Sequence, residues 1–129
     1  MKSLFPFLML TAKLVFSGHG QNSKLNRPGY LIKKAARDTN DIWLLLDSSE
    51  EYSFTKPDTA LLLAQKALHF SRDLHYIRGE IYALNSCGSA FQFMGDYPQA
   101  LKNQFEALQI SRDKKDPASE ADCLGFIGI

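Results

Sequence analysis

Apolar positions recur every three or four residues across residues 83–111, the segment with the clearest pattern in the chain. This spacing is that of one buried face of an α-helix. The pattern is interrupted once, at Gly95 and Asp96, a pair typical of a tight turn. Residues 83–111 therefore predict two helices folded back on each other as a hairpin.

The same pattern returns at a fixed period of 40 when the sequence is shifted against itself. The match needs no gap between residues 58 and 129. The matched residues include Ala60 with Ala100, Leu61 with Leu101, Ala67 with Ala107, Leu68 with Leu108, Glu80 with Glu120, Leu84 with Leu124 and Gly88 with Gly128. A fixed period in this range is the signature of stacked helical hairpins. The predicted fold is therefore all-α, an α-solenoid of antiparallel hairpins.

The pattern divides residues 41–129 into three hairpins, the last of them incomplete. Their predicted extents are about 41–74, 75–114 and 117–129, with individual helices at 41–55, 58–74, 75–94, 97–114 and from 117 onward. Residues 21–40 are predicted to be a linker with a short lead-in helix at 30–38. In this linker Pro28 and Gly29 indicate a turn, and Thr39 or Asn40 is the expected N-cap.

Small residues mark where helices should approach closely. Ala60, Ala64 and Ala67 lie three or four residues apart, on one helical face. Glycine inside a helix costs about 1 kcal/mol relative to alanine, so Gly88 predicts a neighbouring helix close by, and Gly128 should repeat it.

The last helix would expose its apolar face, so we expect a fragment of a longer protein, with a terminal capping helix as the alternative.

Residues 1–20 differ from the rest and have the layout of a secretory signal peptide. Lys2 precedes an apolar stretch over residues 4–16, and Gly18 and Gly20 stand where a cleavage site before Gln21 requires small residues. The apolar run is shorter than the roughly 20 residues of a membrane span. We therefore expect export, with an uncleaved anchor or an ordinary amphipathic N-terminus as alternatives.

Charge and composition exclude several classes of function. The net charge is +1, and loss of Lys2 and Lys13 with the signal would change it to −1. Without a basic excess, nucleic-acid binding is not expected. No phosphate loop, nucleophile elbow or zinc spacing occurs, so we expect neither an enzyme nor a cofactor. The candidate side chains for metal or acid–base chemistry are His19, His69 and His75, and the acidic group Asp47, Glu50 and Glu51.

Neither candidate group has the partners that its chemistry needs. His19 would leave with the signal, and His69 and His75 do not share a helical face, so a metal site is not expected. The acidic group has no neighbouring histidine or lysine and is interpreted as a solvated face.

The two cysteines, Cys87 and Cys123, are interpreted as small core residues. The residues one period away from them are Ile127 and Ala83, which are apolar. A disulfide between them stays open as an alternative, because export permits one and first helices of successive hairpins are neighbours.

Six positions resemble the tetratricopeptide repeat pattern, in which large, small and aromatic residues alternate on the first helix and small residues lie on the second. These are Leu84, Gly88, Phe91, Tyr97, Ala100 and Ala107, and Leu124 and Gly128 begin the same pattern again. Ser48 replaces the glycine in the first hairpin. The period of 40 exceeds the usual 34 of that family, so the helices should be longer than standard.

A narrower resemblance is to the exported repeat regions of bacterial two-component sensor kinases and related regulators. There, hairpins similar to residues 48–68 and 94–101 follow a signal peptide and precede a membrane helix and an output domain. The resemblance implies a peptide- or protein-binding module, the sensory part of a larger, membrane-tethered signalling protein. A stand-alone exported scaffold is the alternative.

In stacked hairpins of this family the first helices line the concave side, which is where a partner would bind. Counted from Gly88, the predicted groove residues are Leu45, Ser49 and Tyr52 in the first hairpin and Tyr82, Asn85, Ser89 and Gln92 in the second. Family members that grip a peptide's terminal carboxylate use Lys, Arg and Asn at such positions. Only Asn85 fits, so a carboxylate clamp is not expected.

Mass spectrometry of the protein expressed in an exporting bacterium tests the signal peptide. We expect the mature chain to begin at Gln21, because cleavage should follow Gly20. Soluble cytosolic protein that retains Met1 would contradict export.

Overall fold

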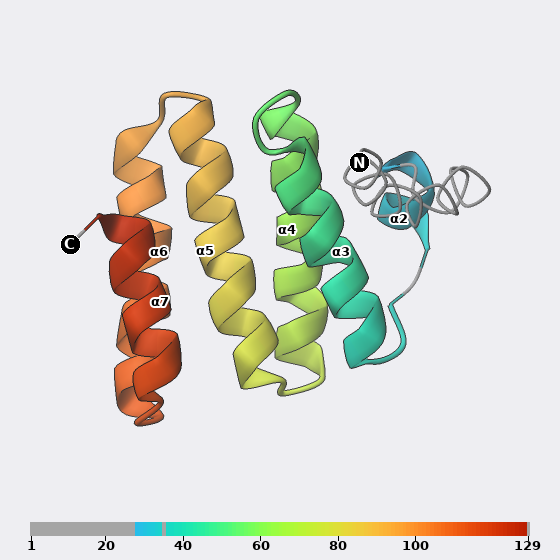
Figure 1. The fold of residues 1–129 in the computed structure, drawn as a ribbon. Coiled ribbons are helices and arrows are strands. Elements are labelled where there is room, and N and C mark those ends of the chain that lie inside the picture. The colour runs from blue at the N-terminus through green and yellow to red at the C-terminus, as the bar shows by residue number, and fades with distance from the viewer. Residues whose placement is uncertain (1–27, 35, 129) are drawn as a thin grey trace, which may run out of the picture.

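The computed structural model describes residues 28–34 and 36–128, and these form six helices without a strand among them (Figure 1). The helices are α2 (Pro28–Lys33), α3 (Thr39–Tyr52), α4 (Pro57–Asp73), α5 (Ile77–Phe93), α6 (Tyr97–Asp113) and α7 (Pro117–Ile127). The predicted all-α class is confirmed, and every segment predicted to be helical overlaps one of these helices. The predicted signal peptide lies outside the described residues.

The structure corrects two details at the start of the chain. Pro28 and Gly29 do not form a turn but begin α2, since proline fits the first helical turn, where its missing N–H leaves no bond unmade. The N-cap of α3 is Asp38 and not Thr39 or Asn40. Its carboxylate accepts a hydrogen bond from the Asp41 backbone N–H at 3.1 Å.

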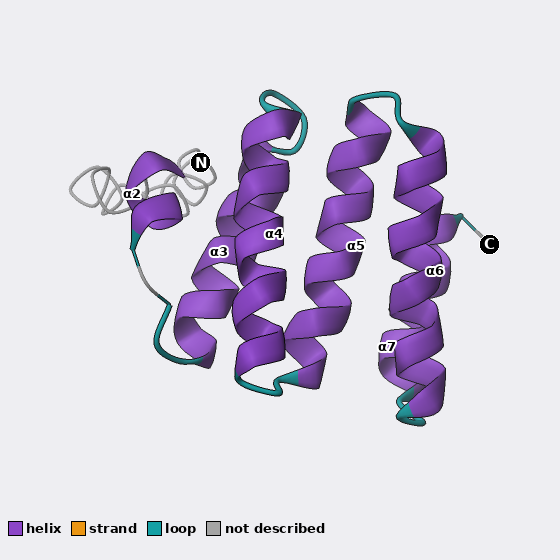
Figure 2. Ribbon diagram, turned by 180° about the vertical axis from the view of Figure 1, so that it is seen from behind, coloured by secondary structure: helices purple, strands orange, loops and turns teal. Residues whose placement is uncertain are grey.

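From α3 to α7, each helix packs against the next one along the chain, and a short turn connects them (Figure 1). The view from behind shows α4 in front of α3 and α6 in front of α7 (Figure 2). Helix α5 also contacts both α3 and α7, and α2 packs on α4. As a result α3, α5 and α7 share one face of the molecule.

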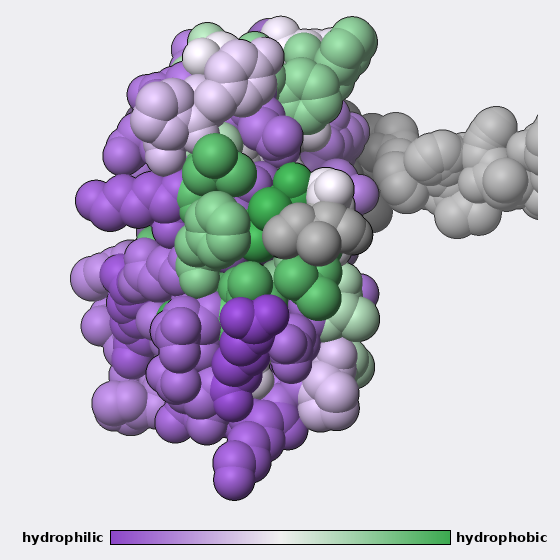
Figure 3. All heavy atoms as spheres, turned by 90° about the vertical axis from the view of Figure 1, so that its left-hand side faces the viewer, coloured by the Kyte–Doolittle hydropathy of each residue, from purple (hydrophilic) through white to green (hydrophobic). Residues whose placement is uncertain are grey.

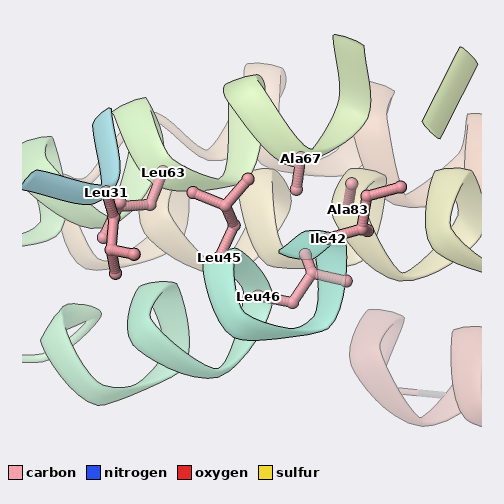
Figure 4. Close-up of a cluster of buried hydrophobic side chains, with 7 residues drawn as sticks. All are labelled: Leu31, Ile42, Leu45, Leu46, Leu63, Ala67 and Ala83. Carbon is pink, nitrogen blue, oxygen red and sulfur yellow. The ribbon is translucent and has the colours of Figure 1, made fainter. Parts of the chain in front are cut away.

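A buried cluster joins α2, α3, α4 and α5 (Figure 4). It contains Leu31 from α2, Ile42, Leu45 and Leu46 from α3, Leu63 and Ala67 from α4, and Ala83 from α5. Burial of each large aliphatic side chain contributes about 1.5–3 kcal/mol to stability. A second cluster continues the core through α5, α6 and α7, with Ile81, Leu84, Ala107, Leu108 and Cys123.

The sequence repeat recurs as a repeat of local structure. Helices α4 and α6 both have 17 residues, and their starts at Pro57 and Tyr97 are one period apart. The turns after them place His75 and Lys115, also one period apart, in the left-handed region at φ 53° and 55°. An ion pair then links each of these helices to the next one. The pairs are Arg72 with Glu80 at 3.0 Å and Arg112 with Glu120 at 2.7 Å.

Gly88 lies where a second helix leaves no room for a side chain, as predicted. A Cβ atom there would stand 2.5 Å from Cγ of Gln104, a fully buried residue on α6. The predicted equivalence of Gly128 is wrong. Gly128 is the C-cap of α7 at φ 92°, and a Cβ there would meet no atom within 4 Å. Its glycine suits the left-handed helix end and not close packing.

Lys66 of α4 fixes the short helix α2. Its ammonium group donates hydrogen bonds to the backbone carbonyls of Leu31, at 2.6 Å, and of Ile32 and Lys34. Carbonyls at a helix C-terminus have no partner within the helix, and a cation there is favourable. Lys66 therefore holds α2 against the pair formed by α3 and α4.

The outer face of α6 and α7 carries apolar side chains among polar ones (Figure 3). The large exposed apolar residues of these two helices are Tyr97, Leu101, Phe105 and Phe126. Within residues 28–34 and 36–128, no helix combines the length and the apolar character needed to cross a bilayer.

Two glycine substitutions test the packing at Gly88. We expect Gly88→Ala to lower the free energy of unfolding by about 1–2 kcal/mol, because overpacking against Gln104 outweighs the gain in helix propensity. Gly125 is the matched control, since it is also helical but has open space around it. Gly125→Ala should raise stability by about 0.5–1 kcal/mol. Urea unfolding followed by circular dichroism measures both.

A third variant assigns the cost to the proposed contact. In a Gln104→Ala background, Gly88→Ala should cost clearly less than in the wild type. An equal cost in both backgrounds would mean that Gln104 is not what limits the space at residue 88.

Candidate binding groove

A hollow of about 720 Å³ runs across the face shared by α3, α5 and α7. Residues from all three helices line it: Trp43, Leu46, Asp47, Ser49, Glu50, Ser53, Tyr82, Ser86, Ser89, Phe93, Ala121, Asp122, Gly125 and Phe126. We call this hollow the groove. Its volume is in the range of known ligand sites.

Aromatic residues form the end of the groove near the start of each helix. Trp43 packs edge-on against Tyr82, with ring centroids 5.2 Å apart, and its indole N–H donates to the Tyr76 hydroxyl at 2.9 Å. The Tyr82 hydroxyl in turn donates to the Asp122 carboxylate at 2.7 Å. This bond, together with burial, raises the pKa of the Tyr82 phenol. Because these contacts connect α3, α5 and α7, they fix this end of the groove.

Serines occupy the middle of the groove. Ser49 and Ser53 come from α3 and the turn that follows it, and Ser86 and Ser89 come from α5. Ser49 is buried, and its hydroxyl donates to the Ala60 carbonyl at 2.8 Å, which ties α3 to α4. Serine side chains are short and offer hydrogen bonds. They therefore leave space in the groove and make its surface polar.

Phenylalanines stand at the other end. Phe93, near the end of α5, is 52% exposed and packs edge-on against Phe54, which is 76% exposed. Phe126 of α7 adds a third exposed ring to this region of the molecule. Exposed aromatic rings next to a concavity are typical of binding surfaces.

The charged residues of the groove are all acidic. Asp47 and Glu50 are exposed on α3, one helical turn apart, and Asp122 is exposed on α7. None of the groove residues named above is a lysine, arginine or histidine. Elsewhere among the described residues, acidic side chains such as Asp41, Glu80 and Glu120 lie within 4 Å of a basic one.

Three of the seven predicted groove residues line the groove: Ser49, Tyr82 and Ser89. The other four do not. Leu45 is a buried member of the cluster described above, and Tyr52 is half-buried against that cluster. Asn85 is fully buried, with its amide donating to Cys123 Sγ at 3.4 Å, and Gln92 accepts a hydrogen bond from Gln104 of α6.

The difference is a shift of register around the helix. Along α5 the groove residues are Tyr82, Ser86, Ser89 and Phe93. At about 100° per residue, positions 85 and 92 lie roughly 70–90° away from that line. Asn85 stands four residues before Ser89, whereas the groove residue Ser86 stands three before it. The same difference on α3 separates the predicted Leu45 from the observed Leu46, counted back from Ser49.

The predicted repeat positions divide by their burial. Leu84, Ala100 and Ala107 are buried, and Phe91 and Leu124 are half-buried. Tyr97 is 61% exposed, because it is the first residue of α6 and faces outward from the turn.

The cysteines lie in the core, and His69 lies on the surface of α4. Cys87 and Cys123 are buried free thiols, which matches the core interpretation and not the disulfide. His69 pairs with Asp73 at 3.3 Å on the surface of α4. Among residues 28–34 and 36–128, no three histidine, cysteine or acidic side chains converge to hold a metal ion.

Sequence reasoning missed Trp43, Leu46, Ser53, Ser86, Phe93 and the α7 residues of the groove, and it assigned Asp47 and Glu50 only to a solvated face. The repeat carried a signal for some of the α7 residues. Positions 122 and 126 of α7 lie one period after positions 82 and 86 of α5, and all four line the groove. The aromatic contacts of Trp43 join helices distant in sequence and leave no such signal.

Comparison of the chain with models of protein families, with curated proteins and with solved structures found no match.

Thiol titration tests the buried state of the cysteines. Burial raises the pKa of the Cys87 thiol to about 12, and a protonated buried thiol reacts poorly. We expect neither cysteine to react rapidly with Ellman's reagent in the folded protein at pH 8. Two thiols per chain should react after unfolding without reductant, and fewer than two would indicate a bridge.

Proposed function

We propose that this chain is a tetratricopeptide-like α-solenoid that binds a peptide or an extended segment of a protein in its groove. The observation that carries this proposal is the groove itself, built by three helices of equivalent position. Two features of the fold support the solenoid: the periodic recurrence of α4 as α6, and the matching turns at His75 and Lys115.

The chemistry of the groove favours binding over catalysis. Its side chains are aromatic, apolar, hydroxyl and carboxylate groups, which bind but do not form a nucleophile–base pair. The groove follows α3 from Trp43 to Ser53, which corresponds to about 15 Å at the helical rise. An extended chain rises about 3.3–3.6 Å per residue, so four or five residues would fill it.

We further propose that the module is the sensory part of a larger exported signalling protein, in line with the resemblance noted above. An exported scaffold remains the second candidate. The exposed apolar side chains on α6 and α7, such as Leu101 and Phe105, favour it, since such surfaces often mediate assembly.

Selection from a displayed peptide library tests groove binding. We expect peptides selected on the wild-type protein to bind Ser86→Phe at least about tenfold more weakly, because the larger ring would occupy the middle of the groove. Gln65→Phe is the matched control, since Gln65 is exposed on α4 and does not line the groove. Circular dichroism should show both variants folded.

Peptides that bind wild type and Ser86→Phe equally well would contradict the proposal. They would place the contact surface elsewhere on the molecule.

A further inference from the structure

The distribution of charge in the groove indicates what kind of segment it accepts. Asp47 and Glu50 stand one turn apart on α3, and Asp122 stands on α7 across the groove from them. Neither Asp47 nor Glu50 is within 4 Å of a basic side chain in the described part of the chain. Asp122 accepts the Tyr82 hydroxyl, a neutral donor that leaves its negative charge in place.

Helices α3 and α7 contain no basic residue, and Arg78, the single basic residue of α5, does not line the groove. Arg78 lies beside Tyr82 and Asp116 at the start of α5, where its charge acts on the phenol from outside the groove residues. Arg72 and Arg112 are engaged by acidic side chains near the turns. The groove therefore presents a negative field between aromatic walls.

A metal ion does not fit this arrangement. The carboxylates are spread along the groove, and no three acidic, histidine or cysteine side chains converge within residues 28–34 and 36–128. A tightly bound divalent cation needs several oxygen ligands within about 2.6 Å of one point. Charges spaced along a channel instead match several cationic groups carried on one chain.

We propose, on the basis of the peptide-binding function argued above, that the groove selects an extended segment in which basic residues alternate with apolar ones. The basic side chains lie against Asp47, Glu50 and Asp122, and the apolar side chains lie against Trp43 and Phe93. The serines between them offer hydroxyl groups to the backbone of the segment. This specificity is opposite in sign to a groove that grips a carboxylate.

The test compares two labelled hexapeptides, one alternating lysine with leucine and the other alternating glutamine with leucine. Fluorescence anisotropy measures their affinity for the full chain, and the emission of Trp43, the single tryptophan, reports contact with the groove without a label. We expect the lysine peptide to bind at least about tenfold more tightly. Its dissociation constant should rise when sodium chloride increases from about 50 mM to about 500 mM, because salt screens exposed charges.

Two double variants with the same net charge locate the effect. The double variant Asp47→Asn with Glu50→Gln should lower the affinity for the lysine peptide about tenfold, since two partly exposed charge pairs together reach roughly that factor. Its affinity for the glutamine peptide should equal that of the wild type. The control, Glu51→Gln with Asp58→Asn, removes two exposed charges outside the groove and should change neither affinity.

Other results separate this inference from the proposed function. Equal binding of both peptides, lost in Ser86→Phe, would overturn the charge preference and keep groove binding. If neither hexapeptide binds and the library yields no peptide whose binding depends on the groove, both the charge preference and the proposed groove binding are overturned. Spermidine that quenches Trp43 as strongly as the lysine peptide would overturn the peptide preference and identify a small cation as the occupant. Self-association that the Asp47→Asn and Glu50→Gln variant abolishes would overturn it in favour of a second copy of the chain.

Discussion

Close approach between helices is the constraint on which the rest of this structure depends. Ala60, Ala64 and Ala67 on α4 are fully buried, and Gly88 on α5 has the Gln104 side chain directly against it. A larger residue at any of these positions would push two helices apart. Because α5 is packed between neighbours on both sides, such a displacement would also separate α3, α5 and α7, which together form the groove.

The ends of the groove are held by contacts of a different kind. At one end, the chain of contacts from Tyr76 through Trp43 and Tyr82 to Asp122 connects three helices with two hydrogen bonds and an edge-on ring contact. Rigid positioning of this type lowers the conformational entropy that the groove side chains would lose on binding a partner. The phenylalanine end is more exposed, so the two ends of the groove differ in how firmly they are fixed.

The all-α class and the positions of the helices were predictable because their signals are local and repeated. The apolar spacing defines α3 to α7, and the longer repeat relates α4 to α6. Gly88 marks a helix contact because glycine there has a cost that only packing explains. Gly128 shows the limit of the same argument, since a repeat in sequence does not distinguish a helix interior from a helix end. The predicted N-cap of α3 was wrong by one residue, because the carboxylate of Asp38 reaches the backbone N–H of Asp41.

The groove was only partly predictable, because a small rotation about the helix axis separates a core residue from a groove residue. Ser86 and Ser89 face the groove, whereas Asn85, directly before Ser86, is buried against Cys123. Polarity did not reveal this, since Asn85 is as polar as these serines. Only the position of α7, fixed by tertiary packing, determines which side of α5 is covered.

Ser53, Ser86 and Ser89 shape the groove yet contribute little to the contacts that hold the helices together. Architecture and the recognition proposed above are thus encoded at different sites of the same helices. If the groove binds as proposed, a lineage of such proteins can exchange these hydroxyl-bearing positions for larger or differently charged side chains and acquire new partners, while its alanine and glycine positions keep the scaffold unaltered.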